Sequence, residues 1–118
     1  MFTSKHFPNL TELNLGSNEF TSTKMIGHIP SLSILILIHN KIDTLLCSTD
    51  INMPKGLNGC QNLYILDLSY NYLKDFNGLQ FCRLSELKIL KAERNEINKI
   101  DCLENLKQLK ELDVNHNK

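Results

Sequence analysis

One nine-residue pattern occurs five times in the chain, with apolar residues, mostly leucine, at its first, fourth and sixth positions and asparagine at its ninth. The five copies cover residues 10–18, 32–40, 63–71, 87–95 and 109–117. Apolar residues two apart within each copy predict a short strand with one buried side. Because the pattern recurs at a spacing of 22, 31, 24 and 22 residues, the sequence predicts one domain over residues 1–118, built as a solenoid of stacked repeats.

The segments between these copies follow a different spacing. Apolar residues fall at every third position in two of them: Leu73, Phe76 and Leu79, and then 97, 100, 103, 106 and 109. A three-residue spacing is typical of a 3₁₀ turn or short helix with one inward side. The longest repeat also contains a polar, Pro-containing stretch, which predicts an insertion loop near residues 47–55.

The pattern L-x-x-L-x-L-x-x-N resembles the leucine-rich repeat. Its 22-residue form, with I-x-x-I-x-x-L-x-x-L between strands, is similar to an intracellular subclass found in a protein phosphatase 1 regulator, a spliceosomal subunit and many ciliary proteins. The resemblance implies an α/β repeat solenoid, a right-handed horseshoe with a concave parallel β-sheet and a convex side of 3₁₀ turns, short helices and loops. Since no capping unit is visible at either end, we expect a fragment or short isoform of a longer array.

The asparagine that ends each pattern has a structural explanation. Its amide offers two hydrogen-bond donors and a carbonyl acceptor, so it can satisfy backbone groups at the turn after each strand. We therefore expect a ladder of buried asparagines that binds no partner itself. Its members are Asn18, Asn40, Asn71, Asn95 and Asn117.

Composition argues against several partners. Thirteen basic residues balance thirteen acidic ones, so net charge does not favour nucleic acid. The longest apolar run, residues 34–38, is too short to span a membrane, which needs about 20 residues. The four cysteines lack the clustering of extracellular leucine-rich-repeat caps, so we expect reduced, buried thiols. No secretory signal opens the chain, which predicts a cytoplasmic protein, with cilium and nucleus as alternatives.

Chemistry-bearing motifs are also missing from the sequence. The glycine-containing segment 54–59 lacks the G-K-[ST] that would hold a nucleotide. The four histidines share no metal-ligand spacing with the cysteines, and no serine or cysteine has the context of an activated nucleophile. We therefore expect no enzymatic activity, no metal and no cofactor.

The repeat register predicts which side chains face solvent on the concave surface. The third, fifth, seventh and eighth positions point outward, and the tenth lies at the rim. The second repeat carries isoleucine at three of these positions, and tyrosine and arginine, which are favoured at binding hot spots, lie beside it. An apolar patch with a polar rim marks an interaction surface, so we predict a protein-binding site. Its residues are Ile34, Ile36, Ile38, His39, Ile65, Tyr70, Tyr72, Ile89 and Arg94.

Three alternatives to this site stay open. The isoleucines could reflect only the preference of β-branched residues for strands, or a flanking segment of the same protein could cover them. The chain could be a structural spacer of a larger protein without its own partner. RNA binding would require a basic concave face, whereas this face mixes Glu12, Asp67, Glu93 and Asp113 with few lysines. Among protein partners, a phosphatase catalytic subunit, a spliceosomal protein and an axonemal component are equally compatible with the resemblance.

Overall fold

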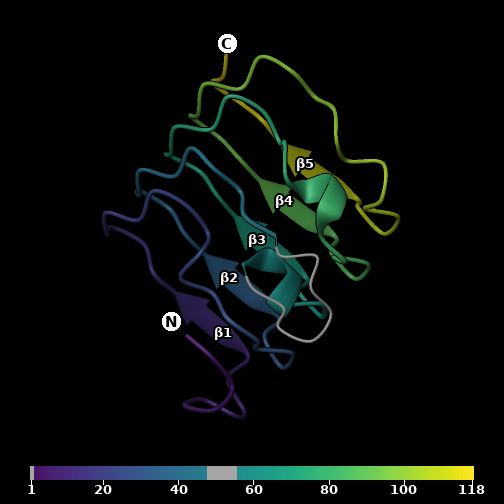
Figure 1. The fold of residues 1–118 in the computed structure, drawn as a ribbon. Coiled ribbons are helices and arrows are strands. Elements are labelled where there is room, and N and C mark those ends of the chain that lie inside the picture. Colours follow the sequence, from purple (N-terminus) through teal and green to yellow (C-terminus); the bar gives the residue numbers. More distant parts are fainter. Residues whose placement is uncertain (1, 48–55) are drawn as a thin grey trace.

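The computed structural model describes residues 2–47 and 56–118. Five short strands, β1 to β5, follow one another in the solenoid (Figure 1). They are β1 Glu12–Asn14, β2 Ile34–Ile36, β3 Ile65–Asp67, β4 Ile89–Lys91 and β5 Glu111–Asp113. Two 3₁₀ helices occur in the segments between strands, η1 Leu57–Gly59 and η2 Leu79–Phe81. Apart from Cys47, the insertion loop predicted near 47–55 lies outside the described residues.

The five strands form one parallel sheet in the order β1-β2-β3-β4-β5, so neighbours in sequence are neighbours in space. The register aligns the central leucine of each strand with the next, from Leu13 through Leu35, Leu66 and Leu90 to Leu112. Each repeat therefore adds one strand and one layer of core to the repeat before it. The predicted leucine-rich-repeat solenoid with a parallel sheet is confirmed, and the helices among the described residues are the two short 3₁₀ helices η1 and η2.

The core lies between the sheet and the return segments. The central leucines of β2, β3 and β4 are fully buried, as are Leu37 and Leu68, two residues after the central leucines of β2 and β3. At the last strand, Leu112 is 37% exposed although it occupies the same register position. A solenoid buries its leucines between adjacent repeats, and among the described residues β5 has a neighbouring strand on one side only.

The return segments match the three-residue spacing only in part. Leu73, Phe76 and Leu79 are all buried, and η2 begins at Leu79, as the spacing predicts. The expectation is wrong for Ile100, which is 54% exposed in a segment of turns. Two residues later, Cys102 has a left-handed backbone with φ 64°, and the inward spacing resumes beyond it at Leu103 and Leu106.

The motif asparagines make hydrogen bonds within and between repeats. Asn71 is typical: its Nδ2 donates to the carbonyls of Leu37, in the preceding repeat, at 3.0 Å and of Leu68, in its own repeat, at 2.9 Å. Its Oδ1 accepts the N–H of Ile42, also in the preceding repeat, at 2.9 Å. Equivalent bonds recur at three other repeats, at Asn40, Asn95 and Asn117.

The residue before each asparagine has a positive φ, which turns the chain so that the amide lies over the backbone of the turn. The five φ angles lie between 53° and 59°, at Ser17, His39, Tyr70, Arg94 and His116. Non-glycine residues rarely adopt this conformation, so the amide bonds must offset its cost. The same turn places the preceding side chain at the rim of the sheet.

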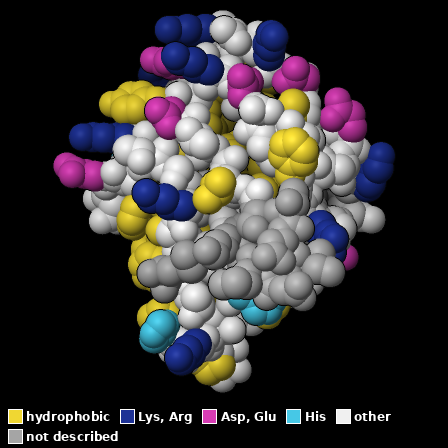
Figure 2. Space-filling view, in the orientation of Figure 1, with side chains coloured by type: hydrophobic (Ala, Val, Ile, Leu, Met, Phe, Trp, Pro, Cys, Tyr) yellow, Lys and Arg dark blue, Asp and Glu magenta, His cyan; other side chains and the backbone are white. Residues whose placement is uncertain are grey.

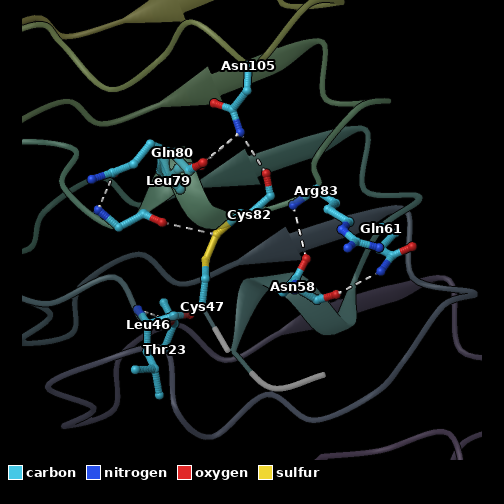
Figure 3. The surroundings of a disulfide bond; sticks show 11 residues. Thr23, Leu46, Cys47, Asn58, Gln61, Leu79, Gln80, Cys82, Arg83 and Asn105 are labelled. Carbon is cyan, nitrogen blue, oxygen red and sulfur yellow. Dashed lines mark hydrogen bonds between the residues drawn. A yellow bond between two sulfur atoms is a disulfide. The ribbon is translucent and has the colours of Figure 1, made fainter. Parts of the chain in front are cut away.

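The cysteines correct one expectation. Cys47 and Cys82 form a disulfide between residues 35 apart in sequence, with their Cα atoms 5.6 Å apart (Figure 3). The expectation of four reduced thiols is wrong for this pair, because stacking brings together return segments whose cysteines show no local spacing. Cys60 is a free buried thiol, and burial raises its pKa to about 12.

The face drawn in Figure 2 carries lysine and arginine side chains interspersed with acidic ones, and no large field of one sign. This agrees with the balanced composition of the chain. No helix among the described residues is both long and apolar enough to cross a membrane.

Candidate functional site on the concave face

The predicted isoleucines lie on the three central strands. Ile34, Ile65 and Ile89 are direct register partners on β2, β3 and β4, and each is partly exposed. Ile36 and Ile38 extend the apolar surface along the second repeat and are also partly exposed. We call these five residues the isoleucine row. Four of the five lie on hydrogen-bonded neighbouring strands and Ile38 lies two residues after the end of β2, so the row is a fixed apolar surface.

Three larger side chains gather beside this row. The rings of His39 and Tyr70 lie 4.3 Å apart between centroids, tilted by 32°. The guanidinium carbon of Arg94 lies over the Tyr70 ring, 5.8 Å from its centroid. We call these three residues the rim cluster. They come from three successive repeats and share the positive φ described above, so the backbone presents all three in the same way.

An open groove of about 330 Å³ runs between the rim cluster and the next exposed column of residues. Its floor includes the buried amides of Asn40 and Asn71, and Tyr72, 52% exposed, lies along it. Its lining residues are Asn18, His39, Asn40, Lys41, Tyr70, Asn71, Tyr72 and Arg94. Among the described residues, the lining therefore holds two permanent cations and no carboxylate.

Both cations of the groove have weak ion-pair partners outside its lining. Lys41 Nζ lies 4.0 Å from a carboxylate oxygen of Glu19, and Arg94 Nε lies 4.0 Å from one of Glu93. All four side chains are at least one third exposed. Exposed pairs at this distance contribute little free energy, so both cations remain accessible to a ligand.

The prediction that the fifth and seventh motif positions face solvent is wrong in the third repeat. Asp67 and Ser69 are buried, at 8% and 5% exposure. Asp67 Oδ1 accepts the N–H of Ser69 at 3.0 Å, and Ser69 Oγ accepts the N–H of Glu93 at 3.1 Å. These groups satisfy the backbone at the end of the strand and are held against it rather than being presented to a partner.

The same bond recurs at the fifth position of two other repeats. Asn14 and Asp113 each accept the N–H of the residue two positions later, at 2.9 and 3.0 Å. Asn or Asp at the fifth position of three repeats was the available sequence signal, since these side chains commonly bond the backbone two residues on. The contact between Lys88 and Tyr64, in contrast, had no sequence signal. Lys88 Nζ lies 5.3 Å from the ring centroid of the exposed Tyr64.

A larger opening of about 610 Å³ lies elsewhere, among residues that include Phe20, Met25 and Leu46. Its lining also includes the charged residues Glu19 and Lys24, but it shows no stacked rings or cation–ring contact like those of the rim cluster among the described residues. Leu46 also lies two positions before the first of residues 48–55, which fall outside the described part. The groove and the isoleucine row therefore form the better-defined site.

The described residues contain no group of three or more His, Cys, Asp or Glu side chains placed to hold a metal ion. The site instead combines apolar side chains, stacked aromatic rings and cations. Such a surface binds by packing and by donating hydrogen bonds.

Comparison with known proteins places the chain among repeat proteins. A profile of the family described as leucine rich repeat matches residues 56–118. A crystal structure of a TLR13–ssRNA13 complex shares 32% sequence identity and a TM-score of 0.73 with this chain, over 92% of it. An internalin, InlF of Listeria monocytogenes, shares 23% identity with a TM-score of 0.56 over 92% of this chain, and shows the fold alone.

The matched region is a small part of both larger proteins, 16% of the TLR13 chain and 36% of the internalin chain. No curated protein sequence matches the chain. The family profile covers more than half of the sequence, and the matched residues include β3, β4 and β5 of the parallel sheet. The chain therefore belongs to the leucine-rich-repeat family.

Proposed function

We propose that this chain is a protein-binding module, a scaffold or adaptor, that docks a partner on the concave face of its sheet. The observation that carries this proposal is the isoleucine row, four partly exposed isoleucines on β2, β3 and β4 with Ile38 just after the end of β2. Apolar patches of this kind, rimmed by polar groups, mark interaction surfaces on soluble proteins. The adjacent Tyr70, Tyr72 and Arg94 are residue types that dominate binding energy at interfaces.

The residue types at this register position support a docking role for the isoleucines over a role in strand formation alone. β-Branched residues suit strands, yet the first and last repeats carry Glu12 and Glu111 where the middle three carry isoleucine. The sheet therefore forms with either residue type. Isoleucine at the three central positions is then better explained by a contact than by strand formation.

The finer identity of the partner stays a proposal. The resemblance to the intracellular 22-residue subclass would suggest a phosphatase subunit, a spliceosomal protein or an axonemal component, and each of these requires a chain that works inside the cell. The single-stranded RNA in the similar TLR13 structure belongs to that protein, and the balanced charge of this chain favours a protein partner. We also propose that the module acts by binding rather than by catalysis, because the described residues of the site offer packing surfaces and hydrogen-bond donors.

The working compartment is a separate proposal. The cytoplasmic localisation expected from the sequence stays a prediction, and the Cys47–Cys82 disulfide argues against it. Disulfides persist in oxidising compartments and are rare in the cytosol. We propose that the chain works where this disulfide is maintained, and the thiol state of protein isolated under non-reducing conditions tests this.

The docking proposal is tested by affinity capture with three forms of the protein. The first is the wild type, and the second is Ile36→Glu with Tyr70→Ala, which places a charge in the isoleucine row and removes the centre of the rim cluster. The third is the control, Ile100→Glu with Phe81→Ala. It likewise replaces an isoleucine by glutamate and an aromatic residue by alanine, at residues of the return segments that are 54% and 55% exposed. Circular dichroism checks that each variant is folded.

We expect the wild type and the return-segment variant to retain the same proteins, measured by quantitative mass spectrometry, and the concave variant to lose them. Equal capture by all three forms would show that the concave face is not the site. That result would favour the alternative in which the chain is a structural spacer without its own partner.

A further inference from the structure

We propose that the groove beside the isoleucine row recognises an acidic side chain, Asp or Glu, on an extended segment of the partner protein. This inference rests on the proposed docking function and specifies the chemistry of the partner. The apolar residues of the segment would contact the isoleucine row, and its carboxylate would lie between Lys41 and Arg94.

The charge of the groove carries the first step. Lys41 and Arg94 both line it, and no acidic side chain from the described part of the chain does. Their pairs with Glu19 and Glu93 are at 4.0 Å and exposed, so a carboxylate placed closer would compete well for the same donors. Charge-assisted hydrogen bonds from Arg or Lys to a carboxylate are among the stronger polar contacts in proteins.

The rim cluster also favours binding of a carboxylate, because Tyr70 holds the guanidinium of Arg94 in place. β2 and β4 flank β3, so His39 and Arg94 approach Tyr70 from opposite sides. The histidine ring stacks at 4.3 Å and the guanidinium lies at 5.8 Å from the Tyr70 centroid. An arginine stacked on a ring loses less conformational freedom when it binds a carboxylate.

The same sandwich argues against a nucleic acid as the occupant. Proteins that bind single strands stack successive bases on open aromatic faces. Here the two faces of Tyr70 are already approached by His39 and Arg94, which leaves the ring edge and its hydroxyl for the ligand. The groove is therefore suited to an acceptor group that receives hydrogen bonds.

Continuity with the isoleucine row explains why the acidic group belongs to an extended segment. Ile38 immediately precedes His39, and the groove begins where the strand residues of the second repeat end. A segment lying along β2 and β3 can therefore contact Ile36 and Ile38 and then place its next side chain in the groove. The adjacent rim residue Tyr72, 52% exposed, offers further contact area.

The test uses a displayed library of random 12-residue peptides, selected against the folded wild-type protein. We expect enriched peptides to combine apolar residues with Asp or Glu. In a variant carrying Lys41→Gln and Arg94→Gln, the binding of an enriched acidic peptide should fall about tenfold or more. The matched control, Lys88→Gln with Lys110→Gln, removes the same charge from the other end of the strands and should leave binding within about twofold.

Further measurements separate the possible failures. The single variant Arg94→Lys retains the charge and shows how far binding depends on the stacked guanidinium. Replacing the acidic residue of the peptide by its amide should weaken binding to the wild type. The same replacement should leave binding to the variant with Lys41→Gln and Arg94→Gln unchanged.

Enriched peptides that are apolar without Asp or Glu would overturn the acidic inference and leave the docking proposal standing. If selection on wild type enriches nothing beyond selection on Ile36→Glu, both proposals fail. A decauridine oligonucleotide is tested in parallel. If the oligonucleotide binds the wild type more tightly than any selected peptide and does not bind the variant with Lys41→Gln and Arg94→Gln, the groove is a nucleic-acid site and the inference is wrong.

Discussion

Each internal asparagine of the ladder connects two adjacent repeats through three or more hydrogen bonds. Asn71 lies at 4% exposure with its amide bonded to Leu37, Leu68 and Ile42. Asn18 occupies the same motif position in the first repeat, but it is exposed and bonds only to Leu15 and Gly16 of its own repeat. The two asparagines therefore separate the effect of burial from the effect of residue type.

We predict that Asn71→Ala lowers the free energy of unfolding by about 2–4 kcal/mol, because several buried backbone groups lose their partners. Asn18→Ala, where water can replace the lost bonds, should cost less than about 1 kcal/mol. Urea denaturation followed by circular dichroism measures both. Equal effects of the two substitutions would contradict the role assigned to the ladder.

The return segments depend on one covalent link and on close backbone contacts. The Cys47–Cys82 disulfide connects the return segment of the second repeat with the residue that follows η2. Its loop of 35 residues limits the freedom of the unfolded chain. Nearby, Thr23 Oγ1 donates to the carbonyl of Leu46 at 3.1 Å and accepts its N–H at 2.7 Å, which fixes the residue beside Cys47 (Figure 3).

We predict that Cys47→Ser with Cys82→Ser lowers the free energy of unfolding by about 3–4 kcal/mol, as expected for closing a loop of this size. A reducing agent should lower the melting temperature of the wild type and leave that of the double variant unchanged. Cys102→Ser, at a cysteine outside this bond, is the control. Rapid alkylation of both Cys47 and Cys82 in the folded, unreduced protein would contradict the bond.

η1 ends at a glycine that the packing requires. A Cβ added to Gly59 would lie against the carbonyl oxygen of Gly27, well inside van der Waals contact with backbone. We predict that Gly59→Ala destabilises the fold by about 1–3 kcal/mol through this overlap. Gly16→Ala, whose nearest neighbour would be the Asn14 side chain at 3.1 Å, should cost less. Thermal denaturation of the two variants compares them, and an undisturbed Gly59→Ala protein would refute the close contact.

The sheet and its register could be predicted from the sequence, because the leucine spacing determines which residues are buried at every repeat. The outward position of Ile34, Ile65 and Ile89 followed from the same register. Asp67 departs from it, since a carboxylate at the end of a strand can bond the following N–H, which makes it buried despite its position. The disulfide could not be predicted, because the distance between Cys47 and Cys82 depends on how the return segments stack.

In the assembled solenoid, each repeat is stabilised chiefly by its neighbours. Leu66 of the central strand is fully buried, whereas Leu112 of β5 is 37% exposed. The end of the described chain therefore has a thinner core than the middle, although the local sequence pattern is the same. Differences in local stability should follow position in the array.

We predict that the backbone amides of β5 exchange with deuterium at least about tenfold faster than those of β3, because opening the last repeat exposes less core. Hydrogen exchange measured by NMR resolves the two strands. Uniform exchange rates from β1 to β5 would mean that the solenoid opens only as one unit.

Docking of a partner on the concave face is tested most directly by measuring the affinity of the protein for that partner. Isothermal titration calorimetry with one partner protein recovered by the wild type would compare Ile36→Glu with Ile100→Glu. We predict that Ile36→Glu weakens binding by at least about tenfold, since a buried unpaired charge is costly, and that Ile100→Glu stays within about twofold of wild type. Wild-type affinity in the folded Ile36→Glu protein would contradict docking on the isoleucine row.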